Sequence, residues 1–460
     1  MSTMDYVFRL RSDTRGTVVL TSDPFDVREW DLRAASRDEK ETDNALELRL
    51  KDDSVANNLD EVRTLNLMLK DAHDRNRKKD KRIDPVYAEW MESAGGTVWR
   101  SEVMTAKADW LEDALEYGYW INDTQFADLE FTRLNYWEGP EAQVPLTNPN
   151  GTAEIGDSYV SNVNDGAGVA PYMRYNYLKV DGTAIVGDLS GGTRLEITNP
   201  FDGGAPRLAY VWIGQNYTNP ETFDHWYECE EATHSGTAVA SSGYSGGTAI
   251  SLNVPDSAET QIFKWSISGA QLNAAAGGYF KAMLRFAGTP NRSIRYRLKI
   301  QYSSTDLWQT ELITLDDNYA ILIRDLTTFQ LPPWLPGETG LEALDLILFA
   351  YQTTGSSIPQ SYDALMLMPV DGWRALQYIG YGTPLNYRIV DDGINDVLYM
   401  DNGSGSNKLG IYLGYGQPIT FKPGFDQRIY FQLHSWQANT AEASRFVTLK
   451  MYYRPRRLTI

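Results

Sequence analysis

Acidic side chains are the most numerous groups in this 460-residue chain that could do chemistry. Asp and Glu total 61, against 42 Lys and Arg. Adjacent acidic pairs occur at 52–53, 230–231, 316–317 and 391–392. A glycosidase needs two carboxylates held at a defined separation in a cleft, whereas pairs of this kind are usual in solvated turns. We therefore expect no catalytic residues, and we expect that the protein is not an enzyme.

Two short segments combine nucleophile or metal-ligand types. Gly-Tyr-Ser-Gly-Gly at 243–247 is close to the nucleophile elbow of hydrolases, but it lies in a stretch rich in Ser, Gly, Thr and Ala (234–247) with no helix pattern after it, so we reject it. His-Trp-Tyr-Glu-Cys at 225–229 mixes potential ligands. Cys229 is the only cysteine, and the four histidines are scattered. A packed strand is therefore the better interpretation, and we predict no cofactor.

One basic run stands out in a chain of net charge -19. It contains Arg75, Arg77, Lys78, Lys79, Lys81 and Arg82. Asp74 and Asp80 lower the net positive charge of the run, and it lacks the interleaved aromatic residues that stack on bases. We therefore expect no nucleic acid contact. A basic patch on an acidic protein can instead contact an acidic patch on a neighbouring copy. Arg75, Arg77, Lys78 and Lys79 are the candidates for such an interface.

Aromatic side chains could bind sugars, because a flat ring stacks on the apolar face of a pyranose. The chain has 13 Trp, and most Trp residues are buried in proteins. Four of them, at 308, 334, 373 and 436, are expected at strand ends or in loops. Trp308, Trp334 and Trp436 are the candidates for sugar contact.

The elements that must position these residues are organised around residues 45–81. Leu46, Leu48 and Leu50 alternate with charged residues, which predicts a half-buried strand. From Leu59 the apolar spacing changes to three and four residues, which predicts an amphipathic helix. Its stripe consists of Leu59, Val62, Leu65, Met68, Leu69 and Ala72. We expect Asp60 and Glu61 in the first turn and the basic run in the last, as the helix dipole favours.

The rest of the chain has the pattern of a β protein. Strands are expected at 6–10 and 17–20, and a hairpin at 86–103 across Gly95 and Gly96. Residues 24–41 are expected to be a loop or an extended arm, and residues 145–165 a linker. Short strand candidates then recur to the C-terminus with no intervening helix pattern, which indicates sandwiches. No apolar run is long enough for a membrane span, and the N-terminus has no signal-peptide core.

We divide the chain into three predicted domains. Residues 1–145 form the first. Residues 225–370 form an inserted jelly-roll sandwich, and residues 150–224 plus 371–460 pair around it as a discontinuous sandwich. This nesting is predicted because 172–215 alone offers only about three strands, too few for an independent sandwich.

The order of elements in the first third resembles the distal tail proteins of long-tailed bacteriophages, which have a tail-tube-like fold. It consists of a strand and packed helix in ELRLKDDSVANNLDEVRTLNLMLKDA, followed by PVYAEWM, TVWRSEV and FADLEFTRLNYWEGPE. The remainder resembles carbohydrate-binding modules of jelly-roll type, with SYDALMLMPV as the closing strand. The fold class expected is mainly β: a tail-tube-like sandwich with one packed helix, then two β-sandwich domains.

The resemblance implies a structural protein at the distal end of a phage tail, made in the host cytoplasm and located in the virion. It implies a homo-oligomeric ring, sixfold as the tail is, with the tail tube and tail hub as partners and a host-surface glycan as a ligand. Jelly-roll modules often hold a structural calcium, for which the sequence assigns no ligands. A carbohydrate-binding adhesin-type protein without a ring role is the alternative.

Overall fold

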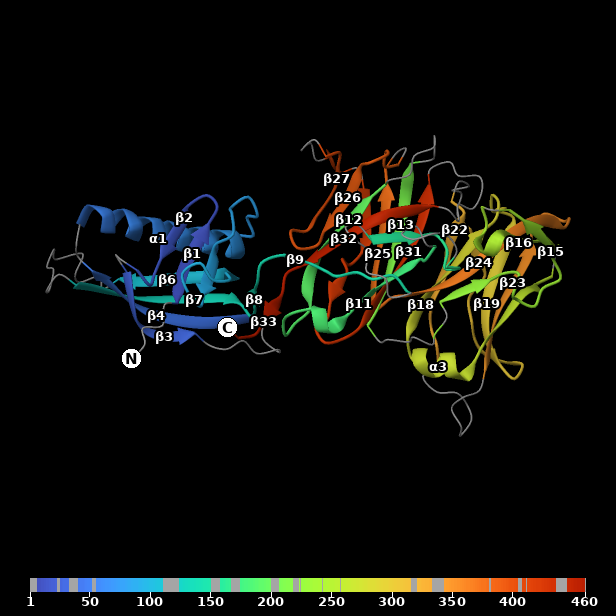
Figure 1. Cartoon of the computed structure of the whole chain (residues 1–460), viewed down its shortest axis with the longest axis horizontal. Helices are drawn as coiled ribbons and strands as arrows, with labels where there is room; N and C mark the ends of the chain where they lie inside the picture. The colour runs from blue at the N-terminus through green and yellow to red at the C-terminus, as the bar shows by residue number, and fades with distance from the viewer. Residues whose placement is uncertain are drawn as a thin grey trace. The chain divides into compact units, whose positions relative to one another are not determined.

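The fold is described from a computed structural model of the chain (Figure 1). The residues described are 6–22, 25–32, 40–51, 55–110, 124–149, 158–166, 174–199, 207–217, 223, 225–241, 243–256, 258–315, 321–332, 343–379, 382–403, 408–410, 412–435 and 445–459. The chain is mainly β, and its strands pair antiparallel, as the sequence predicted. It forms two compact units. Unit 1 contains residues 1–142, 186–191 and 454–460, and unit 2 contains residues 143–185 and 192–453.

Unit 1 is built on one nine-stranded sheet. Seven strands follow the order β2-β1-β5-β6-β7-β4-β3, and β8 and β33 pair beside them. Their bounds are β1 Val7–Ser12, β2 Gly16–Val19, β3 Phe25–Leu32, β4 Glu41–Lys51, β5 Tyr87–Met91, β6 Trp99–Trp110, β7 Thr124–Leu134, β8 Trp137–Glu138 and β33 Arg456–Arg457. The predicted hairpin of β5 and β6 is confirmed, with Trp90 opposite Trp99.

The predicted strand and helix of residues 45–81 are confirmed as β4 and α1 (Val55–Arg77). Leu46 and Leu48 are buried, and so are Leu65, Met68 and Ala72 of the helix stripe. Because α1 begins four residues before Leu59, Asp60 and Glu61 lie beyond its first turn, which contains no acidic residue. The helix ends before Lys79, whose φ of 56° is the left-handed conformation that commonly terminates helices.

The core of unit 1 lies between α1 and the sheet. β6 pairs with β5 through its first residues and with β7 through the rest, across a bulge between Val103 and Thr105. Phe8 of β1 thereby meets Phe131 of β7, with their ring centroids 6.1 Å apart. The C-terminal segment completes this unit, because Arg456 of β33 pairs with Glu138 of β8. Their side chains form an ion pair of 2.7 Å.

Two segments predicted to lack regular structure contain strands. Part of the expected arm at 24–41 is β3, which pairs along β4 from Phe25 to Leu32. The expected linker at 145–165 contains β10 (Ser158–Ser161), and Val160 and Val163 are fully buried. Both predictions were wrong for these residues. The first segment is charged and the second is rich in turn-type residues, so neither has a strand pattern of its own, and each forms a strand because another segment pairs with it.

Unit 2 contains a first pair of sheets drawn from two separate stretches of sequence. One sheet has the order β10-β32-β12-β26-β27-β28, with β9 and β30 beside it, and the other has the order β11-β31-β13-β25-β29. The bounds are β9 Ala142–Gln143, β11 Tyr177–Val180, β12 Gly191–Thr198, β13 Leu208–Asn216, β25 Gly372–Tyr378, β26 Arg388–Asp392, β27 Val397–Asp401, β28 Lys408–Leu409, β29 Tyr412–Gly416, β30 Thr420–Phe421, β31 Gln427–Ser435 and β32 Phe446–Tyr453. A short 3-10 helix, η1 (Gly182–Ala184), follows β11.

A second pair of sheets is formed by residues between these stretches. Their orders are β15-β16-β24-β18-β22, with β14 beside β24, and β17-β23-β19-β20, with β21 beside β19. The bounds are β14 Trp226–Glu228, β15 Thr237–Ala240, β16 Thr248–Val254, β17 Thr260–Ile267, β18 Tyr279–Phe286, β19 Ile294–Tyr302, β20 Thr305–Gln309, β21 Ile313–Thr314, β22 Ile323–Gln330, β23 Leu344–Gln352 and β24 Ile358–Pro369. The helices are η2 (Ser245–Gly247) and α3 (Gly269–Ala275). The independent folding of residues 225–370 as an inserted domain stays a prediction.

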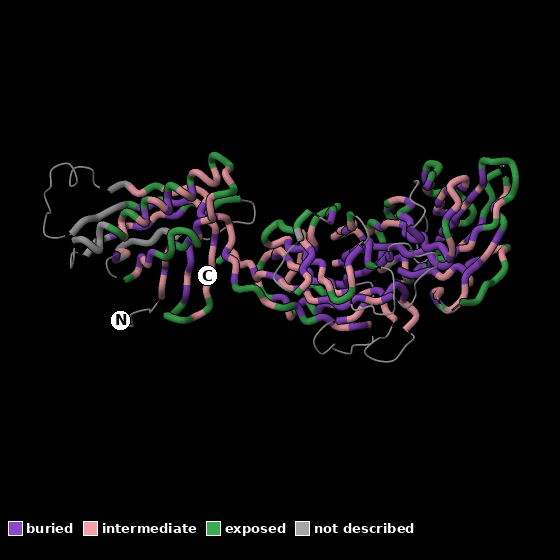
Figure 2. Tube along the Cα trace, turned by 90° about the horizontal axis from the view of Figure 1, so that it is seen from above, coloured by how far each residue is buried: buried purple, intermediate pink, exposed green. Residues whose placement is uncertain are grey.

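The two pairs of sheets in unit 2 pack on each other through an apolar layer. Met283, Met366 and Met368 on β18 and β24 contact Tyr430 of β31, with Trp212 and Trp373 packed against them. Figure 2 shows buried residues as nearly continuous stretches along the strands of this unit. Flexible Met side chains fill the irregular space between sheets, so this layer joins the two sandwiches of unit 2.

Candidate functional sites

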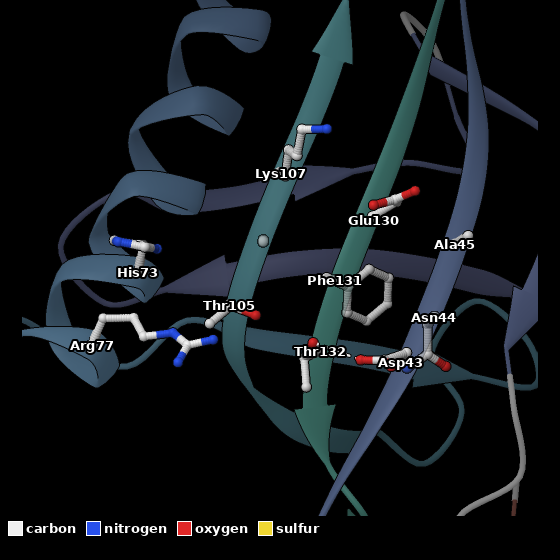
Figure 3. A pocket seen from close by; sticks show the side chains of 11 residues that line it. Asp43, Asn44, Ala45, His73, Arg77, Thr105, Lys107, Glu130, Phe131 and Thr132 are labelled. Atoms are coloured by element: carbon white, nitrogen blue, oxygen red, sulfur yellow. Dashed lines mark hydrogen bonds between the residues drawn. The ribbon is translucent and has the colours of Figure 1, made fainter.

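Unit 1 has a groove beside the C-terminal turns of α1, with a volume of about 520 Å³. Figure 3 shows His73 and Arg77 projecting from the helix, and Lys107, Glu130 and Asp43 on the neighbouring strands. The Thr132 hydroxyl donates to Asp43 Oδ1 at 2.8 Å. The groove is therefore lined by His73 and Arg77 from the end of the helix and by residues of β4, β6 and β7.

The four basic residues predicted for an interface differ in their surroundings. Arg75 is held within the chain, because its Nε donates to Glu102 Oε1 at 3.0 Å and its Nη1 to the Ile83 carbonyl at 2.6 Å. Lys78 is exposed and pairs with Asp74 at 2.7 Å. Arg77 and Lys79 are exposed. Arg77, Lys78 and Lys79 thus lie on the surface of the helix end, whereas Arg75 fixes the loop that follows.

The sheet face away from α1 carries a cross-strand pattern of charge on β4, β7 and β6. Ala45, Glu130 and Lys107 lie opposite one another in one row, and Asp43, Thr132 and Thr105 in another. Glu130, Lys107 and Asp43 are exposed. Residues of the other parity, such as Leu46 and Leu129, are buried under the helix, so one face of the sheet is apolar and the other is wet and polar.

In unit 2 the segment 225–229 forms the packed strand that the sequence predicted, as β14 with its flanks. His225 is buried between aromatic rings, with its ring centroid 4.4 Å from that of Tyr430, and its Nδ1 is 3.0 Å from the Leu367 carbonyl. Burial lowers the pKa of His225 to about 3, so the ring is neutral. Cys229 is buried, and burial raises its pKa well above the usual value.

The same segment builds a carboxylate cluster that the sequence analysis missed. Glu228 Oε1 accepts hydrogen bonds from Trp226 Nε1, at 2.8 Å, and from the Ser245 hydroxyl. The Ser245 amide donates to Asp363 Oδ1 at 3.0 Å. A side chain placed on Gly246 would meet the carboxylates of both Glu230 and Glu228. The cluster thus joins β14, the 243–247 segment rejected as a nucleophile elbow, and β24. The signal available in the sequence was two glutamates spaced by one residue.

The carboxylates in this cluster are hard to ionise. Burial raises the pKa of Glu228 to about 8, that of Glu230 to about 7 and that of Asp363 to about 6. Arg285 lies 3.1 Å from Asp363 and opposes the shift there. Arg174 opposes the shift at Asp363 as well, so the two described cations near the cluster act on Asp363.

We tested whether this cluster fits the calcium that the jelly-roll resemblance implies. As they stand, the described residues include no group of three or more His, Cys, Asp or Glu side chains that could hold a metal ion. Asp363 is engaged by Arg285 and Ser245, but Glu228 Oε2 and Glu230 Oε2 are buried without a hydrogen-bond partner in the described part of the chain. Oxygen atoms of this kind are what calcium prefers. Glu228 and Glu230 would hold the ion, and it would supply charge neutralisation and cross-linking of the loop.

Of the three predicted sugar-contact residues, Trp308 is the one that the structure describes. Trp308 is half-buried and packs on Phe329, with ring centroids 5.3 Å apart, against the core of the second sandwich. Trp334 and Trp436 lie outside the described residues.

Among described helices, none is long and apolar enough to cross a membrane.

No protein-family model and no curated protein matches the chain. Solved structures align over long stretches at low similarity. The Dit hub protein of phage SPP1 aligns at 8% identity over 98% of this chain and 99% of that one, with a TM-score of 0.28. A chain of the phage P2 baseplate in its activated conformation aligns at 10% identity over 75% and 97%, with a TM-score of 0.25.

The VP2 subviral particle of infectious bursal disease virus aligns at 8% identity over 58% and 65%, with a TM-score of 0.17. At these TM-scores the alignments define no common fold.

Proposed function

We propose that the protein is a structural component at the distal end of a phage tail, located in the virion after synthesis in the host cytoplasm. Unit 1 builds a homo-oligomeric ring, sixfold as the resemblance of its element order implies, in contact with tail tube and tail hub proteins. Unit 2 presents β-sandwiches to partners or to the host surface. The protein acts by assembly and binding and catalyses no reaction.

The observation that carries this proposal is the open edge strand of the unit 1 sheet. β3 ends the strand order and pairs with β4 alone among the described strands. An unpaired edge of eight residues is a ready template for a strand of another chain. Since the edge of one copy would meet a different surface of the next, the contact is heterologous, and such contacts close into rings when the rotation permits.

The charges of unit 1 support the same contact. Arg77, Lys78 and Lys79 are exposed at one end of α1, and the polar face of β4 and β7 exposes Asp43 and Glu130. Unlike patches on two different faces can meet between adjacent copies. Exposed charges contribute little to fold stability. We therefore expect these charges to affect association between copies more than the stability of unit 1.

Native mass spectrometry of the full chain tests the proposal. We expect a closed oligomer with six copies as the main species. Reversing Arg77, Lys78 and Lys79 to Glu should shift it to smaller species without lowering the thermal midpoint, whereas reversing Arg63 and Lys70, exposed on earlier turns of α1, should not. Hydrogen exchange should show that amides of β3 gain protection on assembly. A chain that stays monomeric at high concentration and with tail partners would refute the ring.

A carbohydrate-binding adhesin-type protein without a ring role is the second candidate. The observation that favours it is a groove in unit 2 whose lining includes the aromatic residues Tyr210, Trp212, Trp373 and Tyr415. A monomer that binds saccharide would support this candidate over the ring.

A further inference from the structure

Unit 2 has a groove of about 380 Å³ at the margin of the apolar layer between its two sandwiches. One wall is the outer face of β13, β25 and β29. The other is formed by β21, β22 and the residues next to them. The groove is lined by Tyr210, Trp212, Ile313, Thr314, Leu315, Ile321, Ile323, Arg324, Asp325, Trp373, Ala375, Leu376, Gln377 and Tyr415. Its volume is in the range of small-molecule sites.

The register of the three strands places aromatic rings at a fixed spacing. Trp212 lies opposite Ala375, which lies opposite Tyr415 on the next strand. Strands are about 5 Å apart, so the two ring-bearing positions are separated by about 10 Å, with the small Ala375 as the floor between them. Trp373 lies two residues along β25 on the same face. Tyr210 stacks on Trp212 at 5.6 Å between centroids and 9° between planes, which fixes the Trp212 ring.

The polar groups of the groove are mostly uncharged or already paired. Gln377 Nε2 donates to the Tyr210 hydroxyl at 3.2 Å, and Trp373 Nε1 is buried with no hydrogen-bond partner in the described part of the chain. Asp325 pairs with Lys281 at 2.5 Å, and the same Lys281 lies 4.6 Å from the centroid of the Trp373 ring. Lys281 therefore neutralises Asp325, and Arg324, the cation in the lining, is buried with 7% of its surface exposed.

We propose that this groove binds a neutral saccharide, an inference that rests on the carbohydrate-binding candidate function and names its site. Tyr415, which is 48% exposed, and Trp212 flank the space where a pyranose stacks its apolar face, and Trp373 lies further along the same face. The Gln377 amide supplies directional hydrogen bonds of the kind that hydroxyl groups need. A flat, uncharged molecule with one apolar face and many hydroxyls matches rings on the wall, a small floor and a neutral amide.

Binding to the full-length chain is measured by saturation-transfer NMR and by tryptophan fluorescence, with oligosaccharides of glucose, galactose and N-acetylglucosamine as separate probes. We expect at least one probe to bind. Tyr415→Ala should weaken that binding at least about tenfold, equivalent to about 1.4 kcal/mol, and Tyr415→Phe should restore most of it because the ring remains. Ala375→Leu fills the floor and should abolish binding while leaving every ring in place.

Tyr279→Ala is the matched control, because Tyr279 is an exposed tyrosine of unit 2, 53% exposed, that does not line this groove. It should leave binding unchanged. Failure of all three probes to bind, or binding that survives both Tyr415→Ala and Ala375→Leu, would overturn the assignment. An apolar peptide that binds with the same sensitivity where the sugars do not would also overturn it. None of these results depends on whether unit 1 assembles, so ring formation and saccharide binding are tested separately.

Discussion

The guanidinium of Arg285 lies 3.1 Å from the carboxylate of Asp363, with 2% and 0% of the two side chains exposed. This pair connects β18 to β24 under the carboxylate cluster, where Asp363 also accepts the Ser245 amide. A buried pair adds little relative to an apolar pair, but loss of one partner leaves a buried charge without compensation. The stability of β24, which contributes Asp363, therefore depends on Arg285 of β18.

Replacing Arg285 alone should destabilise unit 2 strongly. We expect Arg285→Met to lower the free energy of unfolding by about 3–5 kcal/mol at neutral pH, measured by urea denaturation. The double variant Arg285→Met with Asp363→Leu should recover most of the loss because both charges are then removed. Lys264→Met, which breaks the more exposed pair with Asp345, should cost less than about 1 kcal/mol. Equal costs for the two single variants would contradict this assignment.

The acid cluster predicts an unusual dependence of stability on pH. Because burial raises the pKa values of Glu228, Glu230 and Asp363 to about 8, 7 and 6, the folded chain binds more protons than the unfolded chain between about pH 4 and 8. Their contribution is then greatest at about pH 4 and falls as the pH rises toward 8. Unfolding free energies measured with a chelator present should show this fall.

Glu228→Gln should flatten that profile, whereas Glu231→Gln, at an exposed neighbouring position, should leave its slope unchanged. A profile that rises steadily from pH 4 to 8 and ignores Glu228→Gln would show that the cluster is ionised in the fold.

If Glu228 and Glu230 hold calcium, the ion should offset the fall in unfolding free energy that occurs as the pH rises toward 8. A ligand that binds only the folded state stabilises by about 2.7 kcal/mol at a hundredfold excess over its Kd. We expect added calcium at pH 7.5 to raise the thermal midpoint of the native chain, with no such rise in Glu228→Gln or Glu230→Gln. Magnesium at equal concentration is the ionic-strength control. An identical midpoint with and without calcium would remove the ion from this cluster.

Leu65 on α1 should be critical for unit 1. It is fully buried in the core that also contains Met68 and Phe131, so Leu65→Ala should cost about 2–5 kcal/mol. Lys70→Ala, at an exposed position of the same helix, should change stability by less than about 0.5 kcal/mol. Chemical denaturation followed by hydrogen exchange of α1 measures both. A small cost for Leu65→Ala would mean that the helix does not cover the sheet.

Cys229 gives a direct probe of opening in unit 2. Burial keeps the thiol protonated and out of solvent, and the thiolate is the reactive form. We expect almost no labelling by a thiol reagent in the native chain and rapid labelling in denaturant, with Arg285→Met accelerating the native rate. Fast labelling of the unmodified native protein would show that the segment around β14 opens locally.

The sequence by itself determined the elements with strong local periodicity. The alternation of Leu46 and Leu48 and the stripe through Leu65 and Met68 specify β4 and α1, because a half-buried strand and an amphipathic helix each have a characteristic repeat. The Gly95-Gly96 turn between two strand patterns specified the β5–β6 hairpin. The mainly β class followed from strand patterns with few helix patterns between them.

Only the tertiary structure decided the features that depend on distant residues. β3 is charged and β10 lies in a turn-rich stretch, so neither has a local signal, and both form because β4 and β32 provide pairing partners. Glu228 and Asp363 are 135 positions apart and meet because β14 pairs with β24, which places Glu228 opposite Ala364, and Ser245 then bonds to both. Trp212, Ala375 and Tyr415 face one groove because strand register aligns them. Sequence spacing sets local geometry, whereas strand order and register bring distant side chains into one site.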